Sequence, residues 1–180
     1  KLSVGSLMTS TERSMSRHTV LQGPVYSELL RRVFERAPVW SKGVTILEEP
    51  GGLCWSDGED QTSRTRQLSL LFRRRPETPS GWLPVPCSSL PQPSGKNLSS
   101  RLWAEYFSRG AGATANFERY CQILIPFHLG LMMEFGLALE AHLQNCVVLW
   151  SKDRPEALWV RDWGGLRADS EKVRELFPDL

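Results

Sequence analysis

The chain has 180 residues, with 22 Lys and Arg against 20 Asp and Glu, three His and four Cys. This length suits one domain, and a net charge of +2 lacks the basic excess that is typical of nucleic-acid-binding proteins. The longest uncharged stretch in the apolar middle of the chain, 121–133, is too short to cross a membrane, because a spanning helix needs about 20 mostly apolar residues. These figures exclude a transmembrane helix, and charge alone indicates no partner.

The cysteines and the first residue bear on where the chain works. Cys54, Cys87, Cys121 and Cys146 lie too far apart in sequence for CxxC metal or redox pairs, so we expect free thiols in a reducing cytoplasm. No basic start followed by an apolar core opens the chain, and we expect no signal peptide. Because the first residue is Lys1 rather than Met, we expect the chain to be part of a longer polypeptide.

The first expected elements are a strand, a loop and a helix. Residues 2–6 alternate between apolar and small or polar side chains, as in a strand, and the polar residues 9–17 indicate a loop or a helix cap. From Gly23-Pro24 onward, apolar residues recur every three to four positions until Pro38. This spacing predicts an amphipathic helix between these prolines.

Turn formers and prolines organise the next part. Residues 44–47 and 53–55 are β-branched, apolar or aromatic and flank the turn formers 49–52, which predicts a hairpin. Residues 68–72 predict a further buried strand. The many prolines of 76–95 exclude a long helix and indicate a loop over the surface.

The second half begins with helical periodicity. The pattern turns helical after Leu98 and predicts a long helix over 114–141, kinked or broken at Pro126. The piece 127–141 is apolar nearly all round, which is typical of a central core helix.

A second hairpin completes the expected fold. Residues 146–150 and 157–160 bracket the turn residues 152–155, and the second strand ends at Arg161-Asp162. The composite is an α+β fold in which antiparallel β-hairpins pack on a helical core.

Four polar side chains follow the most apolar helix, and they could converge on one site. If the segment is helical, Glu140 and Gln144 share a face and His142 points nearly opposite, whereas in an extended chain all three point the same way. The alternative is a polar helix terminus, ending with Asn145, that caps itself and faces water. The hairpin would return Asp162 toward Glu140 and Asn145, and two carboxylates with an amide oxygen suit Mg²⁺.

A second polar group opens the chain. It combines the positive charges of Lys1 and Arg13 with the hydroxyls of Thr9 and Ser10, which suits phosphates or carboxylates. Taken alone, such a group is also typical of a solvated loop.

Several of these residues resemble one family. The strings Lys-Leu-Ser at 1–3, Met-Thr-Ser-Thr-Glu-Arg at 8–13, Gln-Gly-Pro at 22–24 and Phe-Gly-Leu-Ala-Leu-Glu-Ala-His-Leu-Gln-Asn at 135–145, with Arg161-Asp162, carry the likeness. They resemble the C-terminal part of the siderophore synthetases that work independently of non-ribosomal peptide synthetases, the aerobactin-synthetase-like (IucA/IucC) enzymes. The resemblance implies an ATP-dependent ligase that adenylates a carboxylate, commonly of citrate, and passes the acyl group to an amine or hydroxyl.

The resemblance also implies roles for the polar residues. ATP phosphates and the substrate carboxylate would contact Lys1, Thr9, Ser10 and Arg13. The nucleotide would contact His142 and Gln144, and Mg²⁺ would be held by Glu140, Asn145 and Asp162. Of these residues, Arg13 and His142 would be catalytic.

The expected organisation follows from these roles. Residues 1–97 form a nucleotide- and substrate-contacting α+β segment with the proline-rich loop 76–95. Residues 98–180 supply the helical core and the hairpin with the Glu-Ala-His-Leu-Gln-Asn motif, and together the two make one fragment of a palm-like portion. We expect a cytoplasmic homo-oligomer in full-length form, with no membrane or nucleic-acid partner, and an inactive fragment on its own.

Two other interpretations are open. One is a truncated or non-catalytic binding module of the same fold. The other is nucleic-acid binding through a local basic patch. The alternative to this function is an ordinary solvated face, on which the Arg side chains cover apolar surface. The patch consists of Arg64, Arg66, Arg73, Arg74 and Arg75 beside Phe72 and Trp82.

Overall fold

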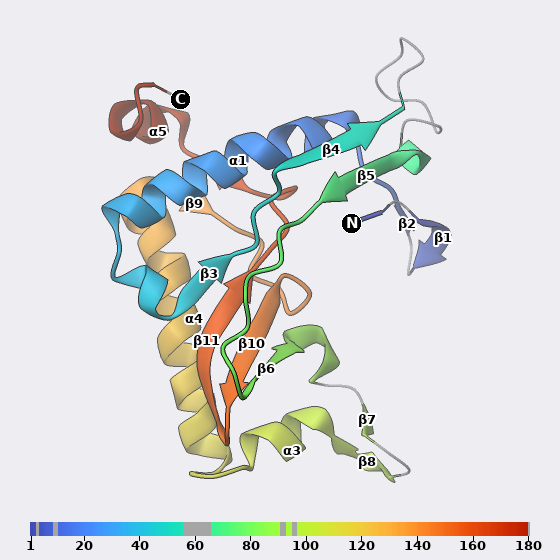
Figure 1. The fold of residues 1–180 in the computed structure, drawn as a ribbon, viewed down its shortest axis with the longest axis vertical. Coiled ribbons are helices and arrows are strands. Elements are labelled where there is room, and N and C mark those ends of the chain that lie inside the picture. Colours follow the sequence, from blue (N-terminus) through green and yellow to red (C-terminus); the bar gives the residue numbers. More distant parts are fainter. Residues whose placement is uncertain (3, 9–10, 56–65, 91–92, 95–96, 180) are drawn as a thin grey trace.

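The computed structural model describes residues 1–180 except 3, 9–10, 56–65, 91–92, 95–96 and 180, and it has the expected α+β fold (Figure 1). Its centre is a four-stranded sheet in the order β3-β11-β10-β6. The strands are β3 (Val44–Ile46), β6 (Trp82–Pro86), β10 (Cys146–Ser151) and β11 (Arg154–Val160). Only β3 and β11 run parallel, and the other neighbours are antiparallel.

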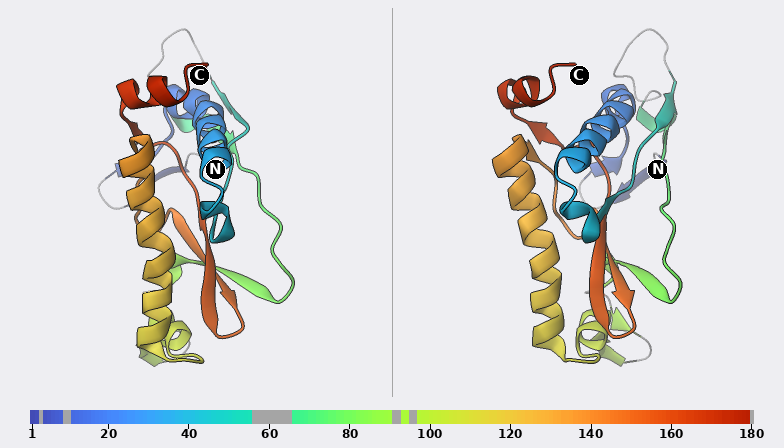
Figure 2. Two further views of the ribbon diagram at one scale, coloured as in Figure 1. Left: turned by 90° about the vertical axis from the view of Figure 1, so that its left-hand side faces the viewer. Right: turned by 60° about the vertical axis from the view of Figure 1, so that its left-hand side comes forward.

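The predicted hairpin of the second half is confirmed as β10 and β11. Val147 lies opposite Trp159 and Val148 opposite Leu158, so β-branched residues of one strand face large apolar side chains of the other. The turn passes through Lys152, whose φ of 56° is left-handed. Every residue of β10 before Ser151 is buried, because the strand is central in its sheet and helix α4 packs against the hairpin (Figure 2).

The first helix, α1 (Arg17–Arg36), begins earlier than the apolar spacing indicated. The Ser16 hydroxyl accepts a hydrogen bond from the Thr19 N–H at 3.1 Å and caps the helix. Pro24 lies inside the helix rather than at its start, and the helix ends before Pro38 as expected. The polar segment before it contains the cap and also a strand.

That strand is β2 (Thr11–Arg13), which pairs antiparallel with β1 (Val4–Met8).

The expected hairpin between residues 44–47 and 53–55 is wrong. Strand β3 pairs with β11, and β4 (Gly51–Cys54) pairs with β5 (Ser69–Phe72) in a separate two-stranded sheet. The turn formers bend the chain but do not determine which strands pair. The Leu47 N–H donates to the Val160 carbonyl at 2.8 Å, which extends the pairing of β3 with β11. The strand expected over 68–72 is confirmed as β5.

The proline-rich stretch is more structured than the loop we expected. It contains β6, the edge strand of the central sheet, which tolerates Pro84 and Pro86 because an edge strand can leave one side unpaired. Further short elements here and elsewhere are η1 (Trp40–Lys42), η2 (Cys87–Ser89), β7 (Pro93–Ser94), β8 (Asn97–Arg101) and α3 (Leu102–Phe107).

The long helix α4 (Ala113–Phe135) ends sooner than expected and continues through Pro126. Gly136 stops it by adopting a left-handed φ of 65°, from which its N–H caps the last turn. The chain then forms β9 (Leu137–Ala138), which pairs with β12 (Arg167–Ala168) before α5 (Ser170–Leu176).

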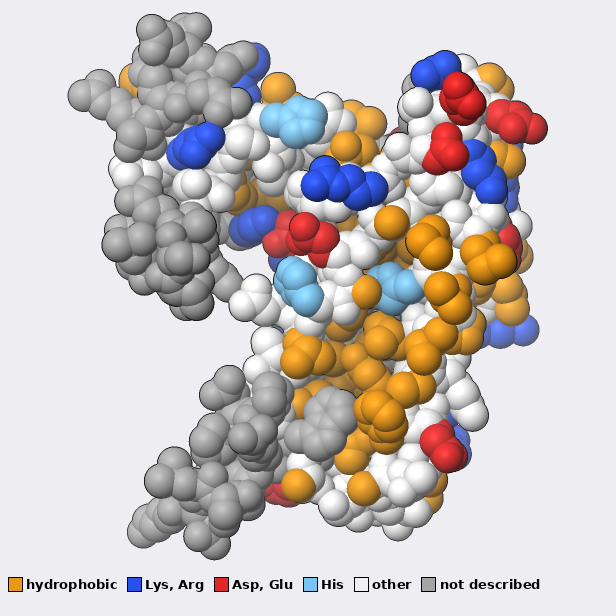
Figure 3. All heavy atoms as spheres, turned by 180° about the vertical axis from the view of Figure 1, so that it is seen from behind, with side chains coloured by type: hydrophobic (Ala, Val, Ile, Leu, Met, Phe, Trp, Pro, Cys, Tyr) orange, Lys and Arg blue, Asp and Glu red, His pale blue; other side chains and the backbone are white. Residues whose placement is uncertain are grey.

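The helix α4 is buried on one face and not all round. Phe127, Leu131 and Phe135 lie in the core, whereas Met132 and Met133 are 51% and 70% exposed. An apolar patch is visible over this side of the molecule (Figure 3). No helix in the described part of the chain has the length and apolar character needed to cross a membrane. The four cysteines are free thiols, as predicted.

Candidate functional site

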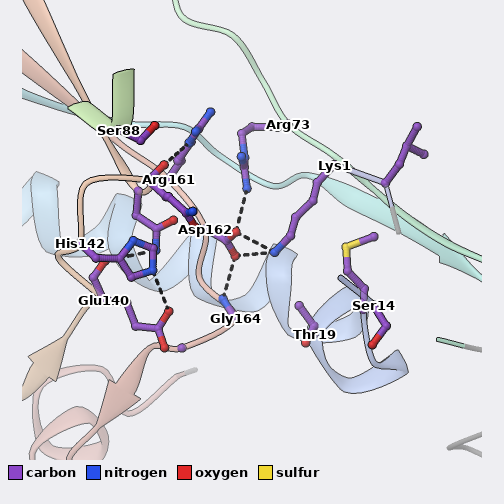
Figure 4. Close-up of a pocket in the computed structure, with 15 residues that line it drawn as sticks. Lys1, Ser14, Thr19, Arg73, Ser88, Glu140, His142, Arg161, Asp162 and Gly164 are labelled. Atoms are coloured by element: carbon purple, nitrogen blue, oxygen red, sulfur yellow. Dashed lines mark hydrogen bonds and ion pairs between the residues drawn. The ribbon is translucent and has the colours of Figure 1, made fainter. Parts of the chain in front are cut away.

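One cleft collects polar side chains from segments that are far apart in the sequence (Figure 4). Its volume is about 810 Å³. It lies where the start of the chain, the segment after β9 and the segment after β11 meet. Its lining includes Lys1, Thr19, Arg73, Ser88, Glu140, His142, Gln144, Asn145, Arg161, Asp162, Gly164 and Gly165.

Lys1 reaches the cleft because its backbone extends the β4-β5 sheet. The Lys1 nitrogen donates to the Leu71 carbonyl at 2.8 Å, and the Leu71 N–H donates to the Lys1 carbonyl at 2.9 Å. The Lys1 ammonium then lies 2.7 Å from both carboxylate oxygens of Asp162. The first residue is thereby tied to the end of β11.

Asp162 is held by its neighbours on the chain. Its backbone has a left-handed φ of 72°, which Asp adopts more readily than most residues. The next residue, Trp163, is 1% exposed and donates from Nε1 to the Ser27 hydroxyl of α1 at 3.0 Å. This buried anchor sets the direction in which the Asp162 side chain enters the cleft.

The charge of Asp162 is stabilised by the cations around it. Burial opposes ionisation, but the Lys1 hydrogen bonds and the positive charges of Lys1 and Arg73 outweigh it and lower the pKa of Asp162 below its ordinary value. Arg73 Nη2 lies 3.9 Å from Asp162 Oδ2. Asp162 is therefore a carboxylate at neutral pH.

The Glu-Ala-His-Leu-Gln-Asn motif is neither helical nor extended, so both geometries that we considered are wrong. An irregular stretch leads into a turn in which the Asn145 N–H donates to the His142 carbonyl at 2.9 Å. The buried Asn145 side chain donates from Nδ2 to the Glu140 carbonyl at 3.1 Å. The His142 Nε2 atom lies 3.6 Å from Glu140 Oε2. Asn145 thus folds the motif back on itself at the edge of the cleft.

Two hydrogen bonds to backbone carbonyls join this motif to the residues after β11. Arg161 donates from its backbone N–H to the Asn145 carbonyl at 3.0 Å and from Nε to the Gln144 carbonyl at 2.9 Å. Gly165 passes so close to Glu140 that a Cβ there would overlap the glutamate carboxyl group. Glu140 and Asp162 therefore line the same cleft.

The oxygen donors present suit a hard divalent cation. Glu140 and Asp162 supply carboxylates, and the Asn145 amide oxygen can complete the set because the amide nitrogen already bonds to Glu140. Among the described residues no group of three His, Cys, Asp or Glu is placed to hold a metal, so the amide is needed as the third donor. The residues fit Mg²⁺ in kind, provided that Lys1 moves off Asp162.

The structure brings together most of the residues predicted from the sequence. Lys1, Glu140, His142, Gln144, Asn145 and Asp162 all line the cleft. Thr9 and Ser10 lie outside the described residues. Arg13 lies in β2 opposite Val4, and its role stays a prediction.

Sequence reasoning missed Arg73 as a cleft residue and assigned it to a basic patch. Arg73 pairs with the buried Glu49 at 2.6 Å, and Arg74 pairs with Glu48 at 2.8 Å. These two arginines are thus engaged with carboxylates. The Glu48-Glu49 and Arg73-Arg74 doublets were the available signal, but the separation of 24 positions between Glu49 and Arg73 hides it.

Comparison with known proteins gives two family matches. The model of the IucA / IucC family matches residues 1–92, and the model described as ferric iron reductase FhuF-like transporter matches residues 115–180.

Two relatives from Staphylococcus aureus (strain NCTC 8325 / PS 47) align over nearly the whole chain. Staphyloferrin A synthase is 31% identical over 100% of this chain and 30% of its own length. D-ornithine--citrate ligase is 30% identical over 98% of this chain and 29% of its own length. The chain therefore spans less than a third of these relatives.

A solved structure shares the fold. ATP-bound aerobactin synthetase IucA from a hypervirulent pathotype of Klebsiella pneumoniae superposes with a TM-score of 0.79 at 20% identity, over 98% of this chain and 34% of the other.

Proposed function

This chain belongs to the IucA / IucC family of siderophore synthetases, and we propose that in the complete protein it forms part of an ATP-dependent ligase. The ligase would activate a carboxylate of citrate or a derivative and condense it with an amine or hydroxyl. One observation carries the proposal: the cleft gathers Lys1, the motif 140–145 and Asp162 from three separate segments. The names of the relatives, which are a siderophore synthase and a citrate ligase, support the same class of reaction.

The proposed reaction has two balanced steps. In the first, a carboxylate oxygen attacks the α-phosphorus of ATP, the bond to the β-phosphate oxygen breaks, and pyrophosphate leaves with an acyl-adenylate formed. In the second, the amine or hydroxyl attacks the acyl carbon, loses a proton, and AMP leaves with the carboxylate oxygen. Both steps develop negative charge around phosphorus or carbonyl oxygen, so fixed cations and hydrogen-bond donors supply most of the catalysis.

The proposed site residues divide into phosphate, nucleotide and metal roles. Lys1, Thr9, Ser10 and Arg13 would bind phosphates and the substrate carboxylate, and His142 and Gln144 would contact the nucleotide. Glu140, Asn145 and Asp162 would hold Mg²⁺, which when bound neutralises phosphate charge. We assign catalytic roles to Arg13 and His142. The observed Lys1–Asp162 ion pair would have to open for these roles, which would free the ammonium for a phosphate and the carboxylate for the metal.

We also propose that residues 1–180 alone do not turn over. The exposed apolar side of α4 supports this, because a patch of this kind is usually covered by another part of the protein (Figure 3). A cytoplasmic homo-oligomer remains our expectation for the complete protein, and the free thiols fit a reducing compartment.

Pyrophosphate release by the complete protein tests the proposal. The assay combines ATP and Mg²⁺ with a panel of citrate-like acids, each with and without amines or hydroxyl compounds. Asp162→Asn should lower the rate at least about a hundredfold, since it removes a proposed ligand of the Mg²⁺ whose charge would stabilise the reacting phosphate. Glu134→Gln, an exposed carboxylate on α4, is the matched control. ATP binding without pyrophosphate release from any acid would support the non-catalytic alternative.

A further inference from the structure

We propose that Arg73 is an anion-binding residue of the cleft and that the buried Glu49 is the positioning residue that holds it. The anion is a phosphate or carboxylate group of the substrates, so the inference rests on the proposed function and deepens it.

Arg73 enters the cleft from the strand beside Lys1. Arg73 follows β5, to which the Lys1 backbone is hydrogen-bonded, so the two cations come from neighbouring segments of the chain. In Figure 4 both side chains extend toward Asp162 from one side, while Glu140 and His142 lie on the other. The Arg73 side chain is 17% exposed, which leaves part of the guanidinium group open to the cleft.

Glu49 is an unusual partner because its side chain is almost fully buried. Its Oε1 accepts a hydrogen bond from Arg73 Nη2 at 2.6 Å. Burial raises the pKa of Glu49, although Arg73 acts in the opposite direction. A carboxylate this deep is costly to keep unless a cation compensates it, so the two side chains depend on each other.

The backbone of Glu49 is fixed from α1. Its N–H donates to the Ser27 hydroxyl at 2.7 Å, and the same hydroxyl accepts the indole N–H of Trp163 and donates to the Gly23 carbonyl at 2.8 Å. Trp163 adjoins Asp162. Ser27 therefore bonds both to Glu49, which holds Arg73, and to Trp163, which adjoins the candidate metal ligand Asp162.

This support leaves guanidinium donors for a ligand. The bond to Glu49 uses one Nη2 N–H, and the Nε–H is buried away from the cleft, so the other Nη donors are those that can meet a ligand. The 3.9 Å separation from Asp162 is too long for a hydrogen bond. A guanidinium held in one place loses little freedom when an oxyanion binds, and its planar fork matches two phosphate or carboxylate oxygens.

The charge balance favours an anion at this point. When Asp162 turns to a metal ion, as proposed above, Lys1 and Arg73 lose a negative neighbour. Glu49, which does not line the cleft, bonds directly to Arg73 and leaves the Lys1 ammonium without a carboxylate in contact. An incoming oxyanion then replaces Asp162 between the two cations.

The test measures ligand binding in the complete protein by calorimetry. The probes are ATP with Mg²⁺, pyrophosphate with Mg²⁺, and citrate, each titrated separately into wild type and variants. Arg73→Gln should weaken binding about 10- to 100-fold for the ligand whose anion it contacts, which is the effect of losing a charge-assisted hydrogen bond. Weakening confined to ATP and pyrophosphate assigns a phosphate, and weakening confined to citrate assigns a carboxylate.

Further variants separate positioning from a structural role. Glu49→Gln should weaken the same ligand by about 3- to 10-fold, through KM more than kcat, because Arg73 stays present but is less firmly held. The double variant Glu49→Gln/Arg73→Gln removes both charges, so its thermal stability should recover relative to the single variants while its affinity stays low. The control is Glu48→Gln/Arg74→Gln, the adjacent surface pair, which should bind all probes as wild type does.

Two outcomes would overturn the inference. The first is that Arg73→Gln binds every probe with wild-type affinity. The second is that the affinity of the double variant Glu49→Gln/Arg73→Gln recovers together with its stability, because Arg73 would then be only the counter-ion of Glu49. Failure of the proposed function looks different. The wild-type protein would then release no pyrophosphate with any acid, while Arg73→Gln still weakens binding of an anionic probe. A wild-type protein that binds none of the three probes would overturn both.

Discussion

The Lys1 ammonium contacts both carboxylate oxygens of Asp162 at 2.7 Å, across 161 residues of sequence. This ion pair joins the β4-β5 sheet to the end of β11 across the cleft. It also occupies the oxygens that a metal ion would need. If Asp162 is a Mg²⁺ ligand, as proposed, the Lys1 ammonium and the metal compete for it. The residue that is proposed to bind phosphate would then keep Mg²⁺ away from Asp162 when no phosphate is bound.

Removing the ammonium should thus favour the metal. We expect Lys1→Met in the complete protein to bind Mg²⁺ without nucleotide about two- to fivefold more tightly, since a partly exposed ion pair contributes up to about 1 kcal/mol. Binding of ATP should weaken at the same time, because a phosphate contact is lost. Calorimetric titration with Mg²⁺ and then with ATP measures both changes.

The matched control is Lys152→Met, on the β10-β11 turn, which should change neither affinity. An unchanged Mg²⁺ affinity in Lys1→Met would show that Asp162 is not a metal ligand, or that Lys1 does not compete for it.

Stability should depend on pH through Asp162. Its pKa in the folded protein is held below the ordinary value of 3.8, so the folded state binds this proton less readily than the unfolded chain. The stabilisation is therefore complete above about pH 4 and is lost as the pH falls through the lower folded-state pKa. Asp162→Asn should flatten this part of the curve of Tm against pH.

Asp153→Asn makes the same chemical change at an exposed residue and serves as the reference for this pH series. If both variants lose Tm equally as the pH falls, the Lys1 and Arg73 charges do not stabilise the Asp162 carboxylate.

A methyl group at Gly165 should disturb the site without unfolding the protein. Its Cβ would overlap the end of the Glu140 side chain, which is flexible and about half exposed at 53%, so the carboxyl group can move away. We expect Gly165→Ala to keep nearly wild-type stability while Mg²⁺-dependent pyrophosphate release falls at least about tenfold, because a proposed metal ligand is displaced.

Gly51→Ala is the control for adding a methyl group, since a Cβ there meets no neighbour within 4 Å. Wild-type Mg²⁺ dependence in Gly165→Ala would count against Glu140 as a ligand.

Asn145 should contribute to both stability and activity. Its side chain is 7% exposed and donates to the Glu140 carbonyl, so Asn145→Ala leaves a partly buried carbonyl unpaired at a cost of about 1–3 kcal/mol. Urea unfolding of the complete protein measures this loss, and pyrophosphate release should fall as the motif loosens. Gln144→Ala, at an exposed neighbour, should change the free energy of unfolding by less than about 0.5 kcal/mol. Equal losses in the two variants would mean that Asn145 does not hold the motif.

Local patterns in the sequence were sufficient for several elements. The hairpin of β10 and β11 was predicted because its strands, its turn and its pairing partners all lie within 15 consecutive residues, from Cys146 to Val160. The core side of α1 follows from apolar spacing, and the identity of most cleft residues followed from short strings such as Glu140–Asn145. Each of these features depends on side chains that are close together in the chain.

Tertiary contacts decided what local patterns left open. Strand β3 joined β11 rather than the nearby β4, because partners in a sheet are chosen by burial across the whole fold. The motif after β9 took an irregular turn, because Asn145 and Arg161 bond its carbonyls. Arg73 became a cleft residue only through Glu49, which is 24 residues away. Sequence spacing alone does not indicate such pairings, because their free energy comes from burying charges together in the folded protein.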